Sequence, residues 1–431
     1  MLTINQAALS FDSSGGNQSV SLVANKVWSA SSSRSWCKVS PSSGDGSDNS
    51  KFTLSVSCDA NTTYDERSCT ITVVCEEMTK VIAVTQVERE GLEVLQQTYN
   101  VSFDNQQIDI LVNSNISVQV DVDSPWISYI GSKALGSSVL SFQIEENESE
   151  ERQAIITLRG ESIRVNVDVH QAAHYVDFDD ISFKQYCISN YDKNSDGNIS
   201  IAEAKAIETI VVCTDNISSL KGIEYMENLQ SLRCCGSTES VFSNGQLVER
   251  KEYGRLISLD VSNNLLLTHL LCSGNKLTEL DIRNNTQLKE LYCYHNQLTA
   301  LDISRNIELQ KIWCEMNYIS SLDLKSNTEL QNLDCSNNNL SILDVSNCYL
   351  LSVLLCVHND IQELALNNNP DLFSLSCDFT LLSSLDVSNN LKLGYLSCHN
   401  NPYLTEIWLK KNQTINSLYF DQGVATIRYK D

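Results

Sequence analysis

The segment from residue 192 to residue 203 carries the residue types that bind a hard cation. Oxygen-bearing side chains occupy its positions 1, 3, 5, 9 and 12, namely Asp192, Asn194, Asp196, Ser200 and Glu203. Gly197 at position 6 permits a sharp turn, and Asn198 at position 7 offers its backbone carbonyl. Calcium takes about six to eight oxygen ligands, and this spacing supplies them from one loop. We therefore expect the five side chains and the Asn198 carbonyl to bind one calcium ion in a structural role; the alternative is a polar loop that matches by chance.

Cysteine, a potential nucleophile or soft-metal ligand, recurs every 21 residues in the second half of the chain. The positions are Cys272, Cys293, Cys314, Cys335, Cys356, Cys377 and Cys398. They stand in the repeated pattern L-x-x-L-x-C-x-x-N-x-L-x-x-L-D-[ILV]-x-x-N, with local departures where Thr380 replaces the turn Asn, Ala365 the Asp and Cys348 the second Asn. A fixed period of this length is typical of a solenoid. Leucine and cysteine alternate with outward residues, as in a short strand. We therefore expect these cysteines to be free, buried and chemically quiet.

Two polar columns share this period. Asparagine follows each strand, where its amide can satisfy buried backbone groups that no sheet reaches, at Asn275, Asn296, Asn317, Asn338, Asn359 and Asn401. Aspartate marks the other side of each coil, at Asp260, Asp281, Asp302, Asp323, Asp344 and Asp386. A row of carboxylates could suggest catalysis, but its period favours turn and cap residues. The sequence contains no GxSxG, HExxH, phosphate-loop or dinucleotide-binding pattern, so we expect no enzymatic activity.

The outward positions of the repeated strands are the candidate binding surface. Strand alternation points two large aromatic residues, Tyr292 and Trp313, towards solvent, where core packing does not require them. Exposed aromatics with interleaved charges are typical of binding hot spots. We predict a partner-binding surface formed by Tyr292, Tyr294, Trp313, Leu355, Glu290, Lys311 and Glu315. The alternative is that neighbouring rings only cover one another along the sheet.

The first 173 residues have a different pattern. Short alternating runs such as SVSLVA, KFTLSVSC and CTITVVC are separated by Gly, Ser and Asn, which indicates an antiparallel sandwich over residues 1–88. The order repeats, with more changes, over residues 89–173. Trp28 and Trp36 could offer a sugar-stacking platform, but a Trp in a sandwich strand is more often part of the core.

A helical cap and a solenoid complete the predicted organisation. Residues 174–212 read as a cap in which two short helices, 179–191 and 202–212, flank the calcium loop. Residues 213–431 form the solenoid, with an insertion near 236–255 in which Asn244-Gly245 predicts a hairpin. Near the C-terminus Asn390 is followed by Asn412, one residue later than the period, and we expect a capping coil there.

The repeated motif from Ile217 to about Asn412 resembles the leucine-rich repeat of internalin-like surface proteins, whose 21-residue repeats carry a cysteine ladder. The resemblance implies that a helical cap covers the first coil, around Ile217–Tyr225. The loop at 192–203 resembles one half of an EF-hand pair. No second loop follows, so we expect the solenoid to take the place of the missing half.

The first two domains resemble the BACON family of immunoglobulin-like domains, which are common in exported proteins of gut anaerobes and carry a suspected link to carbohydrate binding. The resemblance rests on Phe11, Gly15-Gly16, Trp28, Trp36, the turn Pro41-Ser42-Ser43-Gly44 and the closing strand that ends at Gln86. The second copy lacks the Pro-Ser-Ser-Gly turn. The sequence thus predicts a mainly β, multidomain chain: two immunoglobulin-like β-sandwiches, a short helical EF-hand cap and a leucine-rich repeat solenoid.

Composition excludes several classes of function. A formal net charge of -24 argues against nucleic acid, which is bound through Lys and Arg. No apolar run approaches the roughly 20 residues that a membrane-spanning helix needs. We expect an exported, monomeric surface protein whose signal or lipid anchor lies outside this sequence and whose thiols are mostly reduced. A protein partner is the first hypothesis, with adhesion or host contact as its purpose; the alternative is glycan binding for polysaccharide capture.

Overall fold

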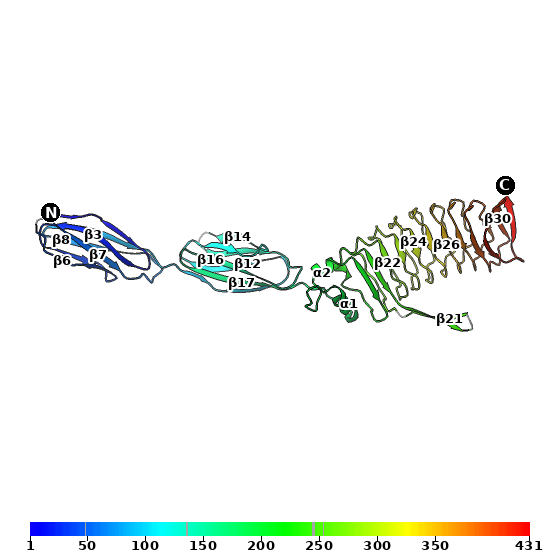
Figure 1. The fold of residues 1–431 in the computed structure, drawn as a ribbon, viewed down its shortest axis with the longest axis horizontal. Coiled ribbons are helices and arrows are strands. Elements are labelled where there is room, and N and C mark those ends of the chain that lie inside the picture. Colours follow the sequence, from blue (N-terminus) through cyan, green and yellow to red (C-terminus); the bar gives the residue numbers. More distant parts are fainter. Residues whose placement is uncertain (48, 135–136, 244–245, 253) are drawn as a thin grey trace. The chain divides into compact units, whose positions relative to one another are not determined.

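The computed structural model describes residues 1–431 apart from 48, 135–136, 244–245 and 253 (Figure 1). The chain is mainly β and divides into two compact units, residues 1–147 with 151–172 and residues 148–150 with 173–431. In the part of the chain that is described, no helix combines the length and the apolar character needed to cross a membrane.

The first sandwich packs two sheets over an apolar core. Its strands are β1 (Leu2–Ile4), β2 (Ala8–Phe11), β3 (Gly16–Ala24), β4 (Trp28–Ser32), β5 (Cys37–Ser40), β6 (Ser43–Gly44), β7 (Ser50–Cys58), β8 (Arg67–Cys75) and β9 (Met78–Gln86). The sheets have the orders β1-β3-β7-β5 and β2-β9-β8-β4-β6. Alternate residues of the long strands β7 and β8 are buried over most of their length, which is why their sequences alternate between apolar and polar residues.

The second sandwich repeats this plan. Its strands are β10 (Leu92–Val94), β11 (Thr98–Val101), β12 (Gln106–Ser114), β13 (Gln119–Val122), β14 (Ile127–Ala134), β15 (Ser137–Ile144), β16 (Arg152–Arg159) and β17 (Arg164–Gln171). The sheets have the orders β10-β12-β15-β14 and β11-β17-β16-β13. Both sandwiches therefore bury one face of each sheet against the other, as the alternation predicts.

The tryptophans of the first sandwich have structural roles. Trp28 is 1% exposed and belongs to the core, which confirms the structural interpretation of that residue. Trp36 lies under the guanidinium of Arg67, 4.3 Å from the ring centroid. Arg67 Nε also donates to Gln86 Oε1 at 2.9 Å, so the arginine joins the tryptophan to the closing strand. The second sandwich repeats this contact with Arg152 above Trp126.

The cap and the solenoid share one hydrophobic core. Helices α1 (Ile181–Tyr191) and α2 (Ile201–Lys205) bury Phe183 and Ile201 in the same cluster as the leucines of the coils. Asp180 caps α1 by accepting hydrogen bonds from the first turn, and its second oxygen accepts Ser218 N–H at 2.8 Å. The cap is therefore fixed to the first coil by apolar packing and by a capping side chain.

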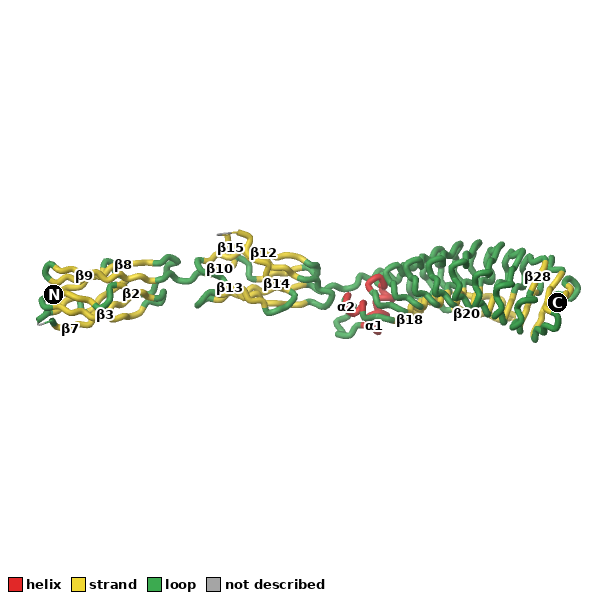
Figure 2. Tube along the Cα trace, turned by 90° about the horizontal axis from the view of Figure 1, so that it is seen from above, coloured by secondary structure: helices red, strands yellow, loops and turns green. Residues whose placement is uncertain are grey.

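The solenoid is a stack of short parallel strands. They are β18 (Thr209–Cys213), β19 (Ser231–Cys235), β22 (His269–Leu271), β23 (Glu290–Tyr292), β24 (Lys311–Trp313), β25 (Asn332–Asp334), β26 (Val353–Leu355), β27 (Ser374–Ser376), β29 (Tyr395–Cys398) and β31 (Ser417–Phe420). In this order they form one ten-stranded sheet. Figure 2 shows the strands along one side of the coils, with loops making up most of the rest. A short 3-10 helix, η1 (Ile223–Tyr225), lies in the first coil, and β28 (Ser384–Asp386), β30 (Glu406–Lys410) and β32 (Thr426–Lys430) form a second parallel sheet near the C-terminus.

Two details differ from the predicted organisation. The second cap helix ends at Lys205, and residues 209–212, predicted as helix, belong to strand β18 instead. Its β-branched sequence TIVVC alternates between exposed and buried, and β18 pairs in register with β19 as the first strand of the sheet. The insertion forms an antiparallel pair, β20 (Thr238–Ser243) and β21 (Gln246–Glu252), while the predicted turn Asn244-Gly245 lies outside the described residues.

The repeated cysteines and asparagines occupy the interior. The seven cysteines of the ladder are at most 1% exposed, and none of the described cysteines is in a disulfide, as predicted for the ladder. Each asparagine amide links two coils: Asn338 Nδ2 donates to the carbonyls of Cys314 and Cys335 at 3.0 and 3.1 Å. Its Oδ1 accepts the Ile319 N–H at 2.9 Å. The side chain thus satisfies three buried backbone groups at the point where the sheet ends.

A second asparagine ladder lies on the other side of the coils. Asn306 Nδ2, for example, donates to the carbonyls of Ile282 and Asn285 at 2.9 and 2.8 Å. In the C-terminal coil this role falls to Gln413, whose Nε2 donates to Val387 and Asn390. Asn412, the residue that continues the column in the sequence, instead takes a left-handed backbone conformation with φ 67°.

Replacing a ladder asparagine should be costly. Asn338→Ala leaves the Ile319 N–H buried without this acceptor and removes one of the two amide donors from each of the carbonyls of Cys314 and Cys335. The free energy of unfolding should therefore fall by about 1 to 3 kcal/mol. Asn339→Ala, the matched control, removes an exposed asparagine of the same coil and should change it by less than about 0.5 kcal/mol. Denaturant unfolding of both variants tests this, and equal losses would contradict it.

Candidate functional site

The outward side chains of the ten-stranded sheet include the aromatic residues that the sequence analysis predicts as part of a partner-binding surface. Trp313 in β24 lies opposite Tyr292 in β23, and their rings stack with centroids 4.7 Å apart. The Tyr294 ring is 6.5 Å from that of Trp313. Although the rings partly cover one another, Trp313 remains 40% exposed. We call Tyr292, Tyr294 and Trp313 the aromatic cluster.

The predicted apolar extension at Leu355 is separated from this cluster. Asp334 lies between Trp313 and Leu355 in the strand register. Neighbouring strands are about 4.8 Å apart, so the Cα atoms of Trp313 and Leu355 are roughly 10 Å apart. Burial raises the pKa of the Asp334 carboxyl, and hydrogen bonds from Ser336 oppose that rise. A carboxyl group therefore divides the aromatic cluster from the apolar side chain beyond it.

An ion pair between Glu290 and Lys311 lies beside the aromatic cluster and is hydrogen-bonded to Tyr292. Glu290 accepts a hydrogen bond from Lys311 Nζ at 2.8 Å and one from the Tyr292 hydroxyl at 3.0 Å. Burial favours a raised pKa for Glu290, but these two donors outweigh it and lower the pKa. Burial and the bond to Glu290 in turn raise the pKa of Tyr292. The ion pair thus holds the Tyr292 ring against Trp313. Glu315 lies half-buried in the coil of Trp313, beyond the strand.

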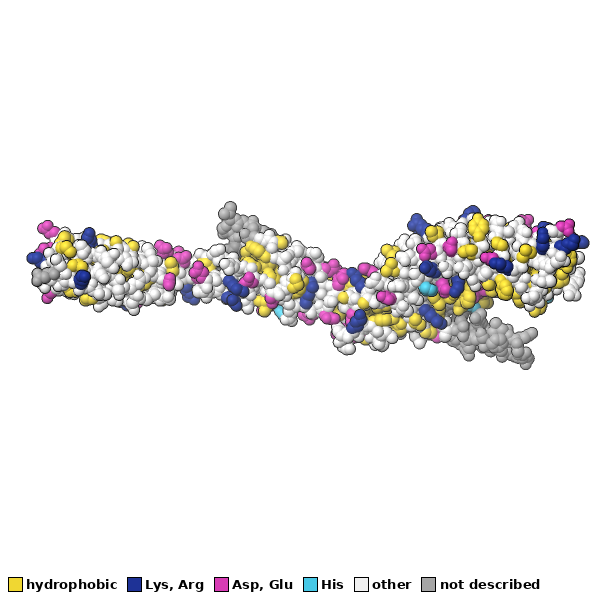
Figure 3. Space-filling view, turned by 45° about the horizontal axis from the view of Figure 1, so that its top comes forward, with side chains coloured by type: hydrophobic (Ala, Val, Ile, Leu, Met, Phe, Trp, Pro, Cys, Tyr) yellow, Lys and Arg dark blue, Asp and Glu magenta, His cyan; other side chains and the backbone are white. Residues whose placement is uncertain are grey.

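A turn residue with a left-handed backbone follows each ladder cysteine at the edge of this face, a feature that the sequence analysis does not predict. The residues two positions after each ladder cysteine have a left-handed backbone, including His295 at φ 53° and Met316 at φ 55°. Most side chains are strained in this conformation, and the sequence signals it only where Gly274, Asn337 and Asn400 occupy the position. A shallow pocket of about 410 Å³ lies at this edge, with Met316 and Tyr318 in its lining. On the face of the solenoid seen in Figure 3, hydrophobic side chains alternate with both signs of charge.

The predicted calcium loop has the backbone that its sequence requires. Gly197 takes φ 84°, and Asp192 accepts the N–H groups of Ser195 and Gly197 at 2.7 and 2.9 Å. Asp196 accepts Asn198 N–H at 2.8 Å. The first half of the loop is therefore folded around its own carboxylates.

Glu203 closes the loop from the first turn of α2. One of its oxygens accepts Lys193 N–H at 2.7 Å, and the other accepts Ser200 N–H at 2.9 Å. The Ser200 hydroxyl accepts Glu203 N–H in return, which makes a capping box. Among the described residues, no group of three or more His, Cys, Asp or Glu side chains is spaced to hold a metal. The all-oxygen donor set nevertheless fits a hard cation such as calcium.

The predicted calcium loop pairs with an extended segment, residues 174–176. Val176 N–H donates to Ile199 O at 2.8 Å, and Tyr175 and Ser200 form an isolated bridge. The Tyr175 hydroxyl also donates to Asp196 Oδ2 at 2.9 Å. The sequence analysis predicted that the solenoid replaces a second loop. The backbone partner of the loop is instead this segment. The solenoid contributes through the core, where Ile199 of the loop packs in the cluster shared with the coils.

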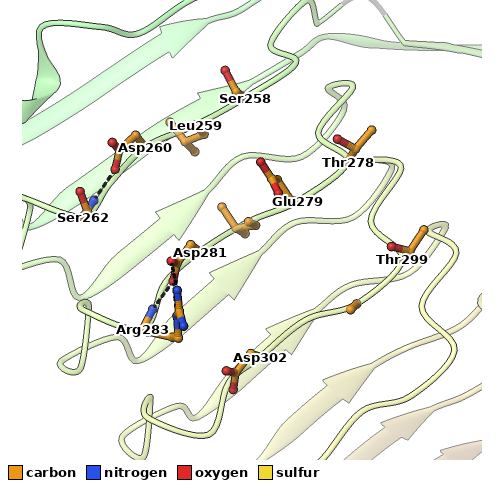
Figure 4. A pocket seen from close by; sticks show the side chains of 12 residues that line it. Ser258, Leu259, Asp260, Ser262, Thr278, Glu279, Asp281, Arg283, Thr299 and Asp302 are labelled. Atoms are coloured by element: carbon orange, nitrogen blue, oxygen red, sulfur yellow. Dashed lines mark hydrogen bonds and ion pairs between the residues drawn. The ribbon is translucent and has the colours of Figure 1, made fainter.

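The aspartate column belongs to turns, as its period predicts. Asp260 and Asp281 each accept the N–H of the residue two positions later, at 2.9 and 3.1 Å. Arg283 also pairs with Asp281 at 2.6 Å and lowers the pKa of that carboxyl to about 2. Figure 4 shows these side chains along a depression of about 740 Å³, with Asp302 in the next coil. The periodic carboxylates therefore hold backbone turns.

Comparison with known proteins identifies the N-terminal domains. The family described as "Viral BACON domain" matches residues 1–89, and BACON, described as "Putative binding domain, N-terminal", matches residues 114–172. The chain therefore carries BACON domains at its N-terminus, as predicted. A comparison with curated proteins finds no match.

Solved structures with similarity to this chain include internalins. The functional domain of InlJ from Listeria monocytogenes, which includes a cysteine ladder, is 24% identical over 53% of this chain and 66% of its own, with a TM-score of 0.32. Internalin C2 of the same species is 20% identical over 52% and 92%, with a TM-score of 0.43. A Bacteroides ovatus GH5 xyloglucanase, solved with a XXXG heptasaccharide, is 32% identical over 21% of this chain, with a TM-score of 0.19. The chain thus spans just under two thirds of the InlJ chain and 19% of the xyloglucanase chain.

The lowered pKa of Glu290 predicts a pH-dependent contribution to stability. Glu290→Gln should reduce the free energy of unfolding above the pKa of unfolded glutamate, about 4.3. The difference from wild type should vanish as the pH falls through the lower folded-state pKa, because both proteins then carry a neutral side chain. Denaturant unfolding across this range, with the exposed Glu329→Gln as control, tests the prediction; identical profiles for the two variants would contradict it.

Proposed function

We propose that this chain is a non-catalytic, exported or cell-surface binding protein that recognises a protein partner through the aromatic cluster. The observation that carries the proposal is the exposed, stacked pair of Tyr292 and Trp313 on the strand face. The core of each coil is already filled by its leucine, isoleucine and cysteine columns, so packing does not require a large ring outside it. Aromatic residues beside a fixed ion pair are typical of interface hot spots.

The proposed role of the two sandwiches is to act as spacers. Trp28 is buried and Trp36 lies beneath Arg67, so their ring faces are largely occupied. Trp126, 9% exposed, is covered in the same way by Arg152. These contacts favour the solenoid over the sandwiches as the recognition surface. Glycan capture at the cell surface is the second hypothesis, since exposed rings also stack on sugars.

The aromatic cluster provides the test. The immobilised 431-residue protein is presented to panels of extracellular-matrix proteins and of polysaccharides. For a partner found in this way, Tyr292→Ala combined with Trp313→Ala should weaken binding by at least about tenfold, because hot-spot side chains contribute about 2 kcal/mol or more. Tyr349→Ala, which removes a 50% exposed tyrosine in the turn after Asn347, is the matched control and should bind like wild type.

The two partner classes give different outcomes. Binding to a protein that is lost with the double variant supports the proposal, whereas undiminished affinity of a folded double variant places the site elsewhere. Polysaccharide binding that persists after deletion of residues 174–431 would favour glycan capture by the sandwiches, which form a compact unit of their own.

We propose further that the loop at 192–203 binds one calcium ion and stabilises the cap. The ligands would be the side chains of Asp192, Asn194, Asp196, Ser200 and Glu203 with the carbonyl of Asn198. Support comes from the oxygen donor set, the left-handed Gly197 and the pairing of the loop with residues 174–176. An ion that binds only the folded loop raises stability by mass action.

Calcium should therefore raise the midpoint of thermal unfolding of the 431-residue protein. Glu203→Gln should weaken binding most, because it removes the charge of the bidentate ligand while keeping an oxygen for the capping box. Asn198→Ala, the matched control, keeps the backbone carbonyl and should bind normally. Calorimetry measures both variants; no heat of binding and no thermal shift for wild type at millimolar calcium would refute the proposal.

A further inference from the structure

Three cysteines that are far apart in the sequence meet at one end of the first sandwich core. Cys37 begins β5, Cys58 ends β7 in the same sheet, and Cys69 lies in β8 of the opposite sheet. Their exposures are 1%, 7% and 7%. The Cys37 thiol contacts both the Cys58 and the Cys69 thiol. We call these three residues the thiol cluster.

The backbone places two of these thiols at disulfide distance. Cys37 lies directly opposite Cys58 in the antiparallel register. The flanking bond from Asp59 N–H to Trp36 O, 2.8 Å long, makes this a non-hydrogen-bonded pair, in which the Cα atoms are about 4.5 Å apart. Disulfides usually join Cα atoms about 4.4 to 6.8 Å apart. Oxidation of this pair therefore needs little backbone movement.

The second sandwich shows that the fold does not require sulfur here. Ile127 follows Trp126 and pairs with Ile144, just as Cys37 follows Trp36 and pairs with Cys58. Ala154 stands two residues after Arg152, as Cys69 stands two residues after Arg67. Three aliphatic side chains fill the position that the thiol cluster fills in the first sandwich. Packing alone thus does not explain three cysteines.

Two other roles for the thiol cluster, three free thiols and a metal site, fit the structure less well. The ladder cysteines of the solenoid lie in parallel, in-register strands about 4.8 Å apart with side chains in the same direction, which suits free thiols. Cys37 and Cys58 differ because their strands are antiparallel. A metal site would need three or more ligands in suitable geometry, and the described residues contain no such group.

We propose that Cys37 and Cys58 are a disulfide site, which joins β5 to β7 when the protein meets a disulfide oxidant, and that Cys69 remains a thiol. In the reaction one cysteine thiolate attacks the oxidant's disulfide bond and releases one thiolate. The second cysteine thiolate then displaces the other half of the oxidant. One protein S–S bond forms, the oxidant's S–S bond breaks, and the two protein protons pass to the two released thiolates.

The bond forms slowly in the folded protein. Burial, followed by contact with Cys37, raises the pKa of the Cys58 thiol to about 12, and the same causes raise that of Cys69 to about 12. Few thiolates are present at neutral pH, so exchange depends on transient opening of the short strand β5 or on folding. The bridge then ties β5 covalently to the centre of the sheet.

The test follows the thiols of the 431-residue protein. Reduced protein is unfolded and refolded in oxidised glutathione, then alkylated under denaturing conditions and examined by mass spectrometry. The alkylated thiols should fall from the full 16 to 14, because two thiols join, and the peptide map should link Cys37 to Cys58. Sixteen alkylated thiols, glutathione adducts without a link, or a link that omits either residue would overturn the proposal.

Two variants separate this pairing from alternatives. Cys69→Ala, which installs the residue of the second sandwich, should still form the Cys37–Cys58 link, and loss of the link would contradict the assigned pair. Cys75→Ala removes a fully buried cysteine of the same sandwich outside the thiol cluster and should leave the link unchanged. Cys37→Ile with Cys58→Ile, the pair found in the second sandwich, should fold and keep all of its remaining thiols reduced.

Discussion

The solenoid depends on hydrogen bonding of the backbone groups that each coil buries where its short strand ends. A three-residue strand pairs only a few of its peptide groups, and the chain must then turn inside the stack. The ladder asparagines solve this problem, since one amide donates to carbonyls of two successive coils and accepts an N–H from the earlier coil. Each coil therefore depends on its neighbour, and the structure extends by repetition.

In this arrangement the outward residues of the strands are not needed to hold the coils together. Leucine and cysteine columns fill the interior, the asparagines bond the turns, and the aspartates hold the far side of the coils. Large outward residues such as Trp313 then need another explanation. The Glu290–Lys311 pair and the stacked Tyr292 give that face a defined geometry, which is what a recognition surface requires.

The structure departs from the repeat at the two ends of the solenoid, where a coil has a neighbour on one side only. At the N-terminal end, β18 adds a strand and the cap covers the apolar first coil with Phe183 and Ile199. At the C-terminal end Gln413 takes the role of a ladder asparagine. The two sandwiches share one plan but differ locally. Both copies keep the tryptophan under an arginine, whereas the adjacent core contains thiols in the first copy and aliphatic groups in the second.

The sequence by itself determined whatever has a fixed period or a fixed local spacing. The 21-residue repeat gave the solenoid, its buried cysteines and the turn role of the aspartates, and strand alternation gave the two sandwiches and the outward direction of Trp313. These features depend on neighbours a known number of residues away.

Tertiary structure alone decided the rest. Residues 209–213 became a strand because the sheet offered an unpaired edge, and residues 174–176 became the partner of the predicted calcium loop. Cys69 reaches Cys37 only because two sheets pack face to face. Such contacts join residues whose separation in the chain follows no rule, so no local pattern could reveal them.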